Sequence, residues 1–370
     1  MTPAPSAALS AQNASSQRLA AIAQARQALS SAGDCSSTLV APWITRSWQR
    51  CLQAGLRPQE SADFDQILPA QMRQTVDANA HWVRIARPLL EQLARAVRNT
   101  GYFAILTDAR GVVVEVAGAI DRSDRRADLI TRIGTDLSEQ RVGTTAIGAA
   151  LGEQRPVWLH RGEHFFSNTT AYSCAGAPVA GPNGACVGML DLTGIAAAER
   201  PELAHLVSQV AGKIGNALVQ AQNHSLLLRL NWPGSMLGGD TDGLLGLDAD
   251  GWIIGANALA RQLVPGLQGG RPCHASDVFG MPLELLFDAA RRSHNTLELP
   301  LWNGLWLQAA ASTPGQQPRV EPVAAPAVGL KDLESSLIRK AVEQARGNVS
   351  QAALALGISR ATVYRKLSKK

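Results

Sequence analysis

The side chains with the clearest chemistry lie in the last forty residues of the sequence. Residues 330–370 contain nine Lys/Arg against three Asp/Glu, whereas the preceding 329 residues are close to neutral. A short basic segment on a neutral body is typical of a module that binds a polyanion, nucleic acid first of all. Polar side chains suited to base edges and phosphates are Asn348, Ser350, Ser359, Arg360, Thr362, Tyr364, Arg365 and Lys366.

Three helices are needed to position these side chains, and the sequence predicts all three. They cover 330–346, 349–356 and 360–367, with Gly347 and Gly357 ending the first two and Ser359 as a favourable N-cap of the third. Ala353 allows close helix crossing and Val363 anchors the last helix, which is the pattern of a helix-turn-helix. The alternative is a solvated basic helical hairpin without a nucleic-acid partner.

The tail resembles the helix-turn-helix of the Fis-type family. The matching segments are Gly347–Ala353, Leu356–Arg360 and Thr362–Leu367. Such domains close bacterial enhancer-binding activators, so the resemblance implies a dimer that binds an inverted-repeat operator in double-stranded DNA. Two recognition helices of a dimer contact half-sites about 34–36 Å apart.

A second group of side chains predicts a small-molecule pocket. Aromatic, histidine and cysteine residues flank a long loop between two predicted strands: Trp158, His164, Phe165, Phe166, Tyr172 and Cys174. Apolar walls with a few polar groups are typical of sites for small effectors. The same aromatic residues could instead only fasten the loop to the sheet, and the sequence leaves both possibilities open.

No set of residues predicts catalysis, a metal centre or a cofactor. Metal-binding side chains occur at His160, His164, Cys174 and Cys186. We expect Cys186 to be a small buried apolar residue instead. Residues 143–148 lack the lysine of a phosphate-binding loop, and Asp191 has no acid–base partner, so we expect Asp191 to be structural. The sequence therefore predicts a protein that is not an enzyme.

The predicted pocket lies in a region of mixed helices and strands. Helices are predicted at 44–56, 70–98, 144–152 and 199–230, and strands at 102–107, 112–116, 157–159, 177–179 and 185–192. Antiparallel strands flanked by helices are typical of an α+β sensor domain. The last helix carries an apolar stripe formed by Leu203, Leu206, Val210, Ile214, Ala217 and Ala221. This stripe could pack on its own domain or on a second subunit; we expect it to hold a homodimer.

A smaller unit and two flexible segments complete the chain. The unit has predicted strands at 243–247 and 252–254, a helix at 257–263, and a hairpin at 297–301 and 305–309. Residues 312–329 are rich in proline and alanine, which indicates a semi-extended linker. Residues 1–32 are rich in Ala, Ser and Gln and predict a loose or marginally helical arm.

The body of the chain resembles acetoin-catabolism activators of the AcoR type. The matching segments are Ser47–Pro58, Gly143–Gly148, Glu163–Phe165, Ser173–Pro178 and Gly188–Gly194. They span residues 40–200, which the family folds as a GAF domain, and residues 244–257 are similar to the start of a PAS domain. Thr145 stands where the family usually has Asn, which bears on ligand preference.

The combined prediction is an α+β multidomain chain with a GAF domain, a PAS-like domain and an all-α helix-turn-helix. Its segments are a flexible arm (1–40), a helical lead-in with the GAF domain and exit helix (41–230), the PAS-like domain (231–311), a linker (312–329) and the Fis-type domain (330–370).

Activators of this type carry a central ATPase, but the sequence has no GxxxxGK[ST] motif. It also has no apolar stretch long enough to span a membrane and no signal peptide at its start. We therefore expect a cytoplasmic DNA-binding regulator that senses a small molecule and does not hydrolyse ATP. The alternative is an adaptor or scaffold that modulates an ATPase-bearing relative and binds DNA only weakly itself.

Overall fold

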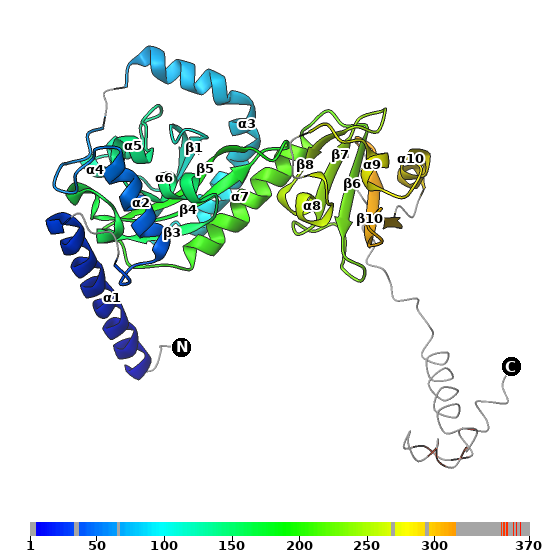
Figure 1. The fold of residues 1–370 in the computed structure, drawn as a ribbon, viewed down its shortest axis with the longest axis horizontal. Coiled ribbons are helices and arrows are strands. Elements are labelled where there is room, and N and C mark those ends of the chain that lie inside the picture. The colour runs from blue at the N-terminus through cyan, green and yellow to red at the C-terminus, as the bar shows by residue number, and fades with distance from the viewer. Residues whose placement is uncertain are drawn as a thin grey trace. The chain divides into compact units, whose positions relative to one another are not determined.

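The structure, a computed structural model, describes residues 5–32, 37–64, 67–267, 271–292 and 296–315, and the single residues 349, 351, 353, 358, 360 and 363. It divides into two compact units, Met1–Pro318 and Arg319–Lys370. The described strands of the first unit form two antiparallel sheets of five strands, each flanked by helices (Figure 1). A fold of mixed helices and antiparallel sheets, as expected from the sequence, is therefore confirmed.

The first sheet region contains β1 to β5 and the helices around them. Its helices are α1 (Pro5–Ala32), α2 (Pro42–Gln53), α3 (Pro69–Ala96), α4 (Arg125–Ile130), α5 (Glu139–Val142), α6 (Ala146–Glu153) and α7 (Leu203–Gln220), with 3-10 turns η1 (Arg161–Glu163) and η2 (Ser167–Thr169). Its strands are β1 (Tyr102–Asp108), β2 (Val113–Ala117), β3 (Val157–His160), β4 (Tyr172–Ala180) and β5 (Cys186–Ile195), in the order β2-β1-β5-β4-β3.

Two hairpins predicted from turn residues form the centre of this sheet. β1 pairs antiparallel with β2, and β4 pairs antiparallel with β5. Gly111 and Gly184 have φ angles of 90° and 84°, the left-handed conformation that the turns require. Both hairpin predictions are confirmed, although β4 begins five residues earlier than expected, at Tyr172.

The two faces of the first sheet are covered by different helices. Leu106, Ala175 and Leu190 pack with residues of α3 and α7 on one face. Ile105, Cys174 and Met189 pack with residues of α1, α2 and α6 on the other. Alternation along each strand therefore decides which side chains face α3 and α7 and which face the N-terminal helices.

The helix expected at 199–230 is shorter, and half of its predicted apolar stripe is buried within its own domain. α7 ends at Gln220, and residues 226–231 form the strand β6 (Leu226–Asn231). Val210 is 9% exposed and Ile214 is 0% exposed, and both belong to the core between α7 and the first sheet. Leu203, Val210 and Ile214 pack on their own domain and are not available for the expected seam, and the homodimer stays a prediction.

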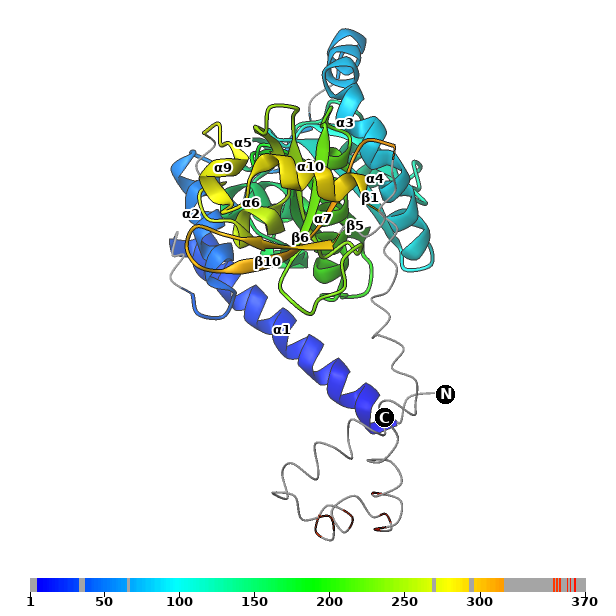
Figure 2. The ribbon, with the colours of Figure 1, turned by 90° about the vertical axis from the view of Figure 1, so that its right-hand side faces the viewer.

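The second sheet region is built around β6. Its other strands are β7 (Gly243–Leu247), β8 (Ile253–Ala256), β9 (Thr296–Pro300) and β10 (Trp306–Ser312), in the order β8-β7-β6-β10-β9. Its helices are α8 (Ala258–Leu263), α9 (Ala275–Val278) and α10 (Leu283–Arg291); α9 and α10 lie beside the strands in Figure 2. The predicted hairpin β9–β10 and the Asn257 cap of α8, which accepts from Ala260 N at 2.8 Å, are confirmed. The sequence did not predict α9 and α10.

The N-terminal residues differ from the loose arm that was expected. Residues 5–32 form α1, and its residues Ile22, Ala25 and Leu29 are at most 3% exposed. These three positions lie on one side of the helix and join the apolar core that includes Trp48 of α2. The spacing of three apolar residues in an Ala- and Gln-rich segment was the available signal.

The second unit is described at six positions. Ala353 and Val363 are buried in one apolar cluster, and Ile358 N donates to Ala353 O at 3.0 Å, as expected for helices that meet across a turn. Arg360 is exposed and helical. The other predicted DNA-contacting residues and the linker beyond residue 315 lie outside the described residues. None of the described helices is long and apolar enough to cross a bilayer.

Candidate ligand-binding site

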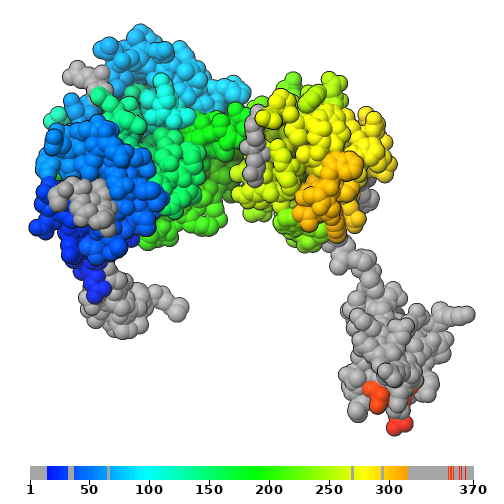
Figure 3. Space-filling model, in the orientation of Figure 1, coloured from blue at the N-terminus to red at the C-terminus, as the bar shows by residue number. Residues whose placement is uncertain are grey.

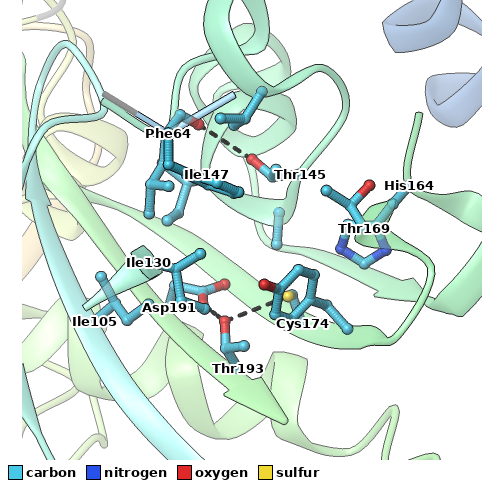
Figure 4. A pocket seen from close by; sticks show the side chains of 14 residues that line it. Phe64, Ile105, Ile130, Thr145, Ile147, His164, Thr169, Cys174, Asp191 and Thr193 are labelled. Carbon is cyan, nitrogen blue, oxygen red and sulfur yellow. Dashed lines mark hydrogen bonds between the residues drawn. The ribbon is translucent and has the colours of Figure 1, made fainter. Parts of the chain in front are cut away.

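A small cavity lies between the first sheet and the helices α4 to α6 (Figure 4). Its volume is about 30 Å³, enough for about two water molecules, because one needs about 10–15 Å³ by this measure. The sheet contributes Ile105, Tyr172, Cys174, Asp191 and Thr193, and the other walls are formed by Phe64, Ile130, Leu137, Val142, Thr145, Ala146, Ile147, His164 and Thr169. Most of this lining is apolar, so the few polar atoms decide what it can bind.

Asp191 is the buried acid of the cavity. It lies in the middle of β5 opposite Ile105 of β1, and it is 1% exposed. Thr193 Oγ1 donates to Asp191 Oδ2 at 2.5 Å, whereas Oδ1 has no partner among the described residues. Burial raises the pKa of the carboxyl group to about 7. The expectation that Asp191 is only structural missed this site, because its cross-strand neighbours cannot be read from one segment.

His164 is the second polar group without a full set of partners. It is 1% exposed, and its Nδ1 lies 2.9 Å from the carbonyl oxygen of Arg161. A carbonyl can only accept, so Nδ1 carries the proton and Nε2 is a free acceptor with no partner among the described residues. Burial lowers the pKa of the imidazole to about 4, so the ring is neutral near pH 7.

The cavity therefore presents two unpartnered polar atoms in an apolar shell: His164 Nε2, an acceptor, and Asp191 Oδ1, which accepts when the carboxyl is ionised and can donate when it is protonated. Leaving such groups unpaired costs about 1–3 kcal/mol each. A ligand that donates hydrogen bonds to Asp191 and His164 recovers this free energy on binding. The described residues contain no group of three or more His, Cys, Asp and Glu placed to hold a metal ion.

The structure brings together three of the six predicted pocket residues. His164, Tyr172 and Cys174 line the cavity, and Phe165 and Phe166 are buried beside it as an edge-to-face pair with ring centroids 5.2 Å apart. Trp158 does not belong to this group. It faces the opposite side of β3 from its neighbours Val157 and Leu159, and its ring stacks on His160.

Hydrogen bonds from side chains of α2 hold the helices α5 and α6 that line the cavity. Ser47 Oγ donates to Glu139 Oε1 at 2.5 Å and lies 2.7 Å from Thr144 Oγ1. Arg50 donates to both oxygens of Glu139 at 2.7 and 2.8 Å. Trp48 Nε1 donates to the Glu163 carbonyl at 3.0 Å, next to His164. The segment Ser47–Pro58, noted for its resemblance, therefore holds α5, the start of α6 and the η1 turn in place.

Thr145 connects this frame to the cavity. It lines the cavity and caps α6, because its Oγ1 accepts from Gly148 N at 3.1 Å and donates to Leu137 O at 3.3 Å. A hydroxyl at this position is shorter than the Asn amide usual in the resembling family. The position is therefore both structural and able to influence the ligand.

The C-terminal segment matches a family of bacterial regulatory proteins. A family model described as "Bacterial regulatory protein, Fis family" matches residues 329–369. Arg360, exposed on a helix of this segment, is the predicted DNA-contacting residue that the structure describes. The Fis-type resemblance of the tail is confirmed.

A second family model, described as "MimR, N-terminal domain", matches residues 19–216, more than half of the chain. The chain belongs to this family. It is 32% identical over 255 residues to the acetoin catabolism regulatory protein of Cupriavidus necator, covering 66% of this chain and 37% of that protein. It is 27% identical over 229 residues to the propane 2-monooxygenase operon transcriptional activator MimR of Mycolicibacterium goodii, covering 59% and 38%. The AcoR-type resemblance is thereby confirmed.

These matches cover only part of the relatives. The chain spans 28–38% of the length of the curated relatives it matches. Among solved structures, the Escherichia coli DhaR(N)–DhaL complex aligns with a TM-score of 0.46 and 13% identity, over 74% of this chain and 100% of that chain.

Proposed function

We propose that this protein is a transcription regulator that senses a small molecule and binds DNA through its Fis-type tail. The observation that carries the proposal is the small cavity with unpartnered Asp191 Oδ1 and His164 Nε2, in a chain whose residues 329–369 match a bacterial regulatory family. A cavity with unpaired polar atoms can take a ligand that supplies their missing hydrogen bonds.

The cavity favours a small, uncharged effector. An anion would meet the Asp191 carboxyl, and a cation would need a partner in an apolar shell that has few polar groups. A neutral molecule with a hydrogen-bond donor satisfies Asp191 Oδ1 or His164 Nε2 without adding buried charge. Acetoin, which appears in the name of one relative, is small and uncharged and carries a hydroxyl donor.

We assign the first sheet region to the GAF type and the second to a PAS-like type. In the first sheet, the last strand β5 lies between β1 and β4. The centre of the second sheet is instead its first strand, β6, so the two sheets differ in strand order. The PAS-like domain thus begins at β6 rather than at residue 231, and the Fis-type domain follows beyond the segment 312–329.

The regulator works in the cytoplasm as a homodimer on an inverted-repeat operator and without ATP hydrolysis. Two copies are needed because one helix-turn-helix contacts a single half-site. The absence of a GxxxxGK[ST] motif supports the lack of ATPase activity. The same absence favours the second candidate, an adaptor that modulates an ATPase-bearing relative.

Two measurements test the proposal. Genomic fragments selected with the full-length protein should give a gel shift that survives excess competitor DNA, because specific binding exceeds non-specific binding by about 10³-fold or more. Loss of all binding in competitor favours the adaptor. A thermal-shift screen of small neutral compounds should find a ligand whose effect disappears in Asp191→Asn and persists in Asp288→Asn, an exposed control. A ligand that stabilises both variants equally would place the effector site elsewhere.

A further inference from the structure

We infer that the N-terminal helix α1 is a gate that must release the η1 turn before a ligand can enter the cavity. The inference rests on the proposed effector role of the cavity. With a volume of about 30 Å³, the cavity holds about two water molecules and is too small for an effector of several non-hydrogen atoms, so one of its walls has to move.

Most walls are held by regular structure. On the sheet side, Cys174 and Asp191 lie in the continuous ladder of β4 and β5. On the helix side, the start of α6 is fixed to α2 by the contacts of Ser47 and Thr144. Both would have to break several hydrogen bonds within a buried network to open.

The His164 wall is built differently. It consists of the short 3-10 turns η1 and η2, whose hydrogen-bond geometry is poorer than that of an α-helix. Arg161 within it has a φ angle of 49°, a left-handed conformation that is unfavourable for a residue with a side chain. This segment therefore has less internal support than the walls formed by the sheet and by α6.

α1 supplies support for that wall from outside. Arg26 Nη1 donates to the carbonyl oxygens of His164 at 2.5 Å and Gly162 at 3.3 Å, and Arg18 forms an ion pair with Glu163 at 3.0 Å. Ile22 packs directly on Gly162, where an added Cβ would lie 3.0 Å from Ile22 Cγ2. The helices α1 and α2 lie beside each other on the surface of this region (Figure 3).

The contact between α1 and the η1 turn is also poised to open. Arg26 is partly buried with no acidic partner among the described residues, and its Nη2 is buried without a hydrogen bond. Burying a cation without a counter-charge is unfavourable, and withdrawal of α1 returns this guanidinium to water. The stripe of Ile22, Ala25 and Leu29 opposes that withdrawal. Closure thus depends on a small set of opposing contacts.

Cys174 provides a probe of opening that needs no effector. Its thiol lines the cavity and is 6% exposed, and burial raises its pKa well above the usual value. Iodoacetamide reacts with the thiolate, so alkylation of Cys174 in the full-length protein reports how often the cavity opens. Mass spectrometry separates this site from the other cysteines of the sequence, which are Cys35, Cys51, Cys186 and Cys273.

One substitution should open the gate, and one disulfide should hold it closed. Ile22→Asp places a charge in the apolar stripe of α1 and should raise the alkylation rate of Cys174 about tenfold or more. Leu19→Asp makes the same change at a position of α1 that is 37% exposed, and should leave the rate near that of the unchanged protein. In the pair Ile22→Cys with Gly162→Cys, a disulfide should fasten α1 to η1 and slow the alkylation of Cys174 relative to the reduced form.

The gate is refuted if Ile22→Asp leaves the Cys174 rate unchanged, or if the disulfide has no effect on it. It is also refuted if Cys51, buried against Thr144, becomes reactive in parallel with Cys174, because the whole domain would then have loosened. These outcomes do not depend on finding an effector, so they are distinct from failure of the proposed function.

Discussion

Replacing Asp191 by Asn should stabilise the protein at alkaline pH but not at acidic pH. The unfolded carboxyl has a pKa of about 3.9, whereas in the folded protein burial raises it to about 7. Between these values the unfolded chain loses its proton first, so stability falls as pH rises through this window. A separation of about three pH units at 1.36 kcal/mol each gives a total loss of about 4 kcal/mol above pH 7.

Asn keeps the size of the side chain and can still accept from Thr193, but it does not ionise. The new amide donor has no partner in the cavity, which costs about 1–3 kcal/mol at every pH. The advantage of the Asp191→Asn variant over the native protein should therefore grow by about 2.5 kcal/mol between pH 5 and pH 8.

Urea denaturation followed by tryptophan fluorescence at these two pH values measures the difference in unfolding free energy. Groups that are the same in both proteins cancel, including the second sheet region. Asp288→Asn, at an exposed carboxyl, is the control and should show no such growth. A stability difference between Asp191→Asn and the native protein that is the same at pH 5 and pH 8 would show that the carboxyl is not held protonated by burial.

Three further predictions concern other parts of the chain. Burial lowers the pKa of His164 from 6.5 to about 4. The free energy of unfolding should therefore fall by about 3 kcal/mol as the pH drops from 6.5 to 4, and urea midpoints of His164→Gln should lack this loss. Val210→Asp or Ile214→Asp should destabilise the first sheet region by about 3 kcal/mol or more, seen as a lower thermal midpoint; a stable protein that only changes from dimer to monomer in sedimentation would contradict the buried assignment. Arg360→Ala should weaken specific DNA binding by about 1–3 kcal/mol in a gel shift, and unchanged affinity would remove Arg360 from the interface.

Local signals were sufficient for much of the fold. The turns at 108–111 and 181–184 combine Asp, Asn, Pro and Gly between apolar runs, and both form hairpins because turn chemistry depends on neighbouring residues alone. The strand β6 could not be predicted in the same way. Leu226, Leu228 and Leu230 alternate into the core, but the four leucines of 226–230 also fit a helical stripe continuing from α7.

Only part of the candidate site could be predicted from neighbouring residues. His164, Tyr172 and Cys174 belong to one stretch of sequence and were predicted together. Asp191 and Thr193 were not, because only the register of β5 against β1 and β4 brings them to the cavity. Trp158 was placed in the wrong group although the predicted strand 157–159 already implied alternating faces.

The central position of β6 has a consequence for the order in which the chain is synthesised. β6 leaves the ribosome first among the strands of its sheet, but one of its two neighbours, β10, begins only about 75 residues later. At about 5–20 residues per second, one edge of β6 waits several seconds for its partner. During that interval the leucine-rich strand can pair with β7 alone and presents an open edge to other nascent chains. Truncated products that stop before residue 306 should therefore be the species most prone to aggregate during expression.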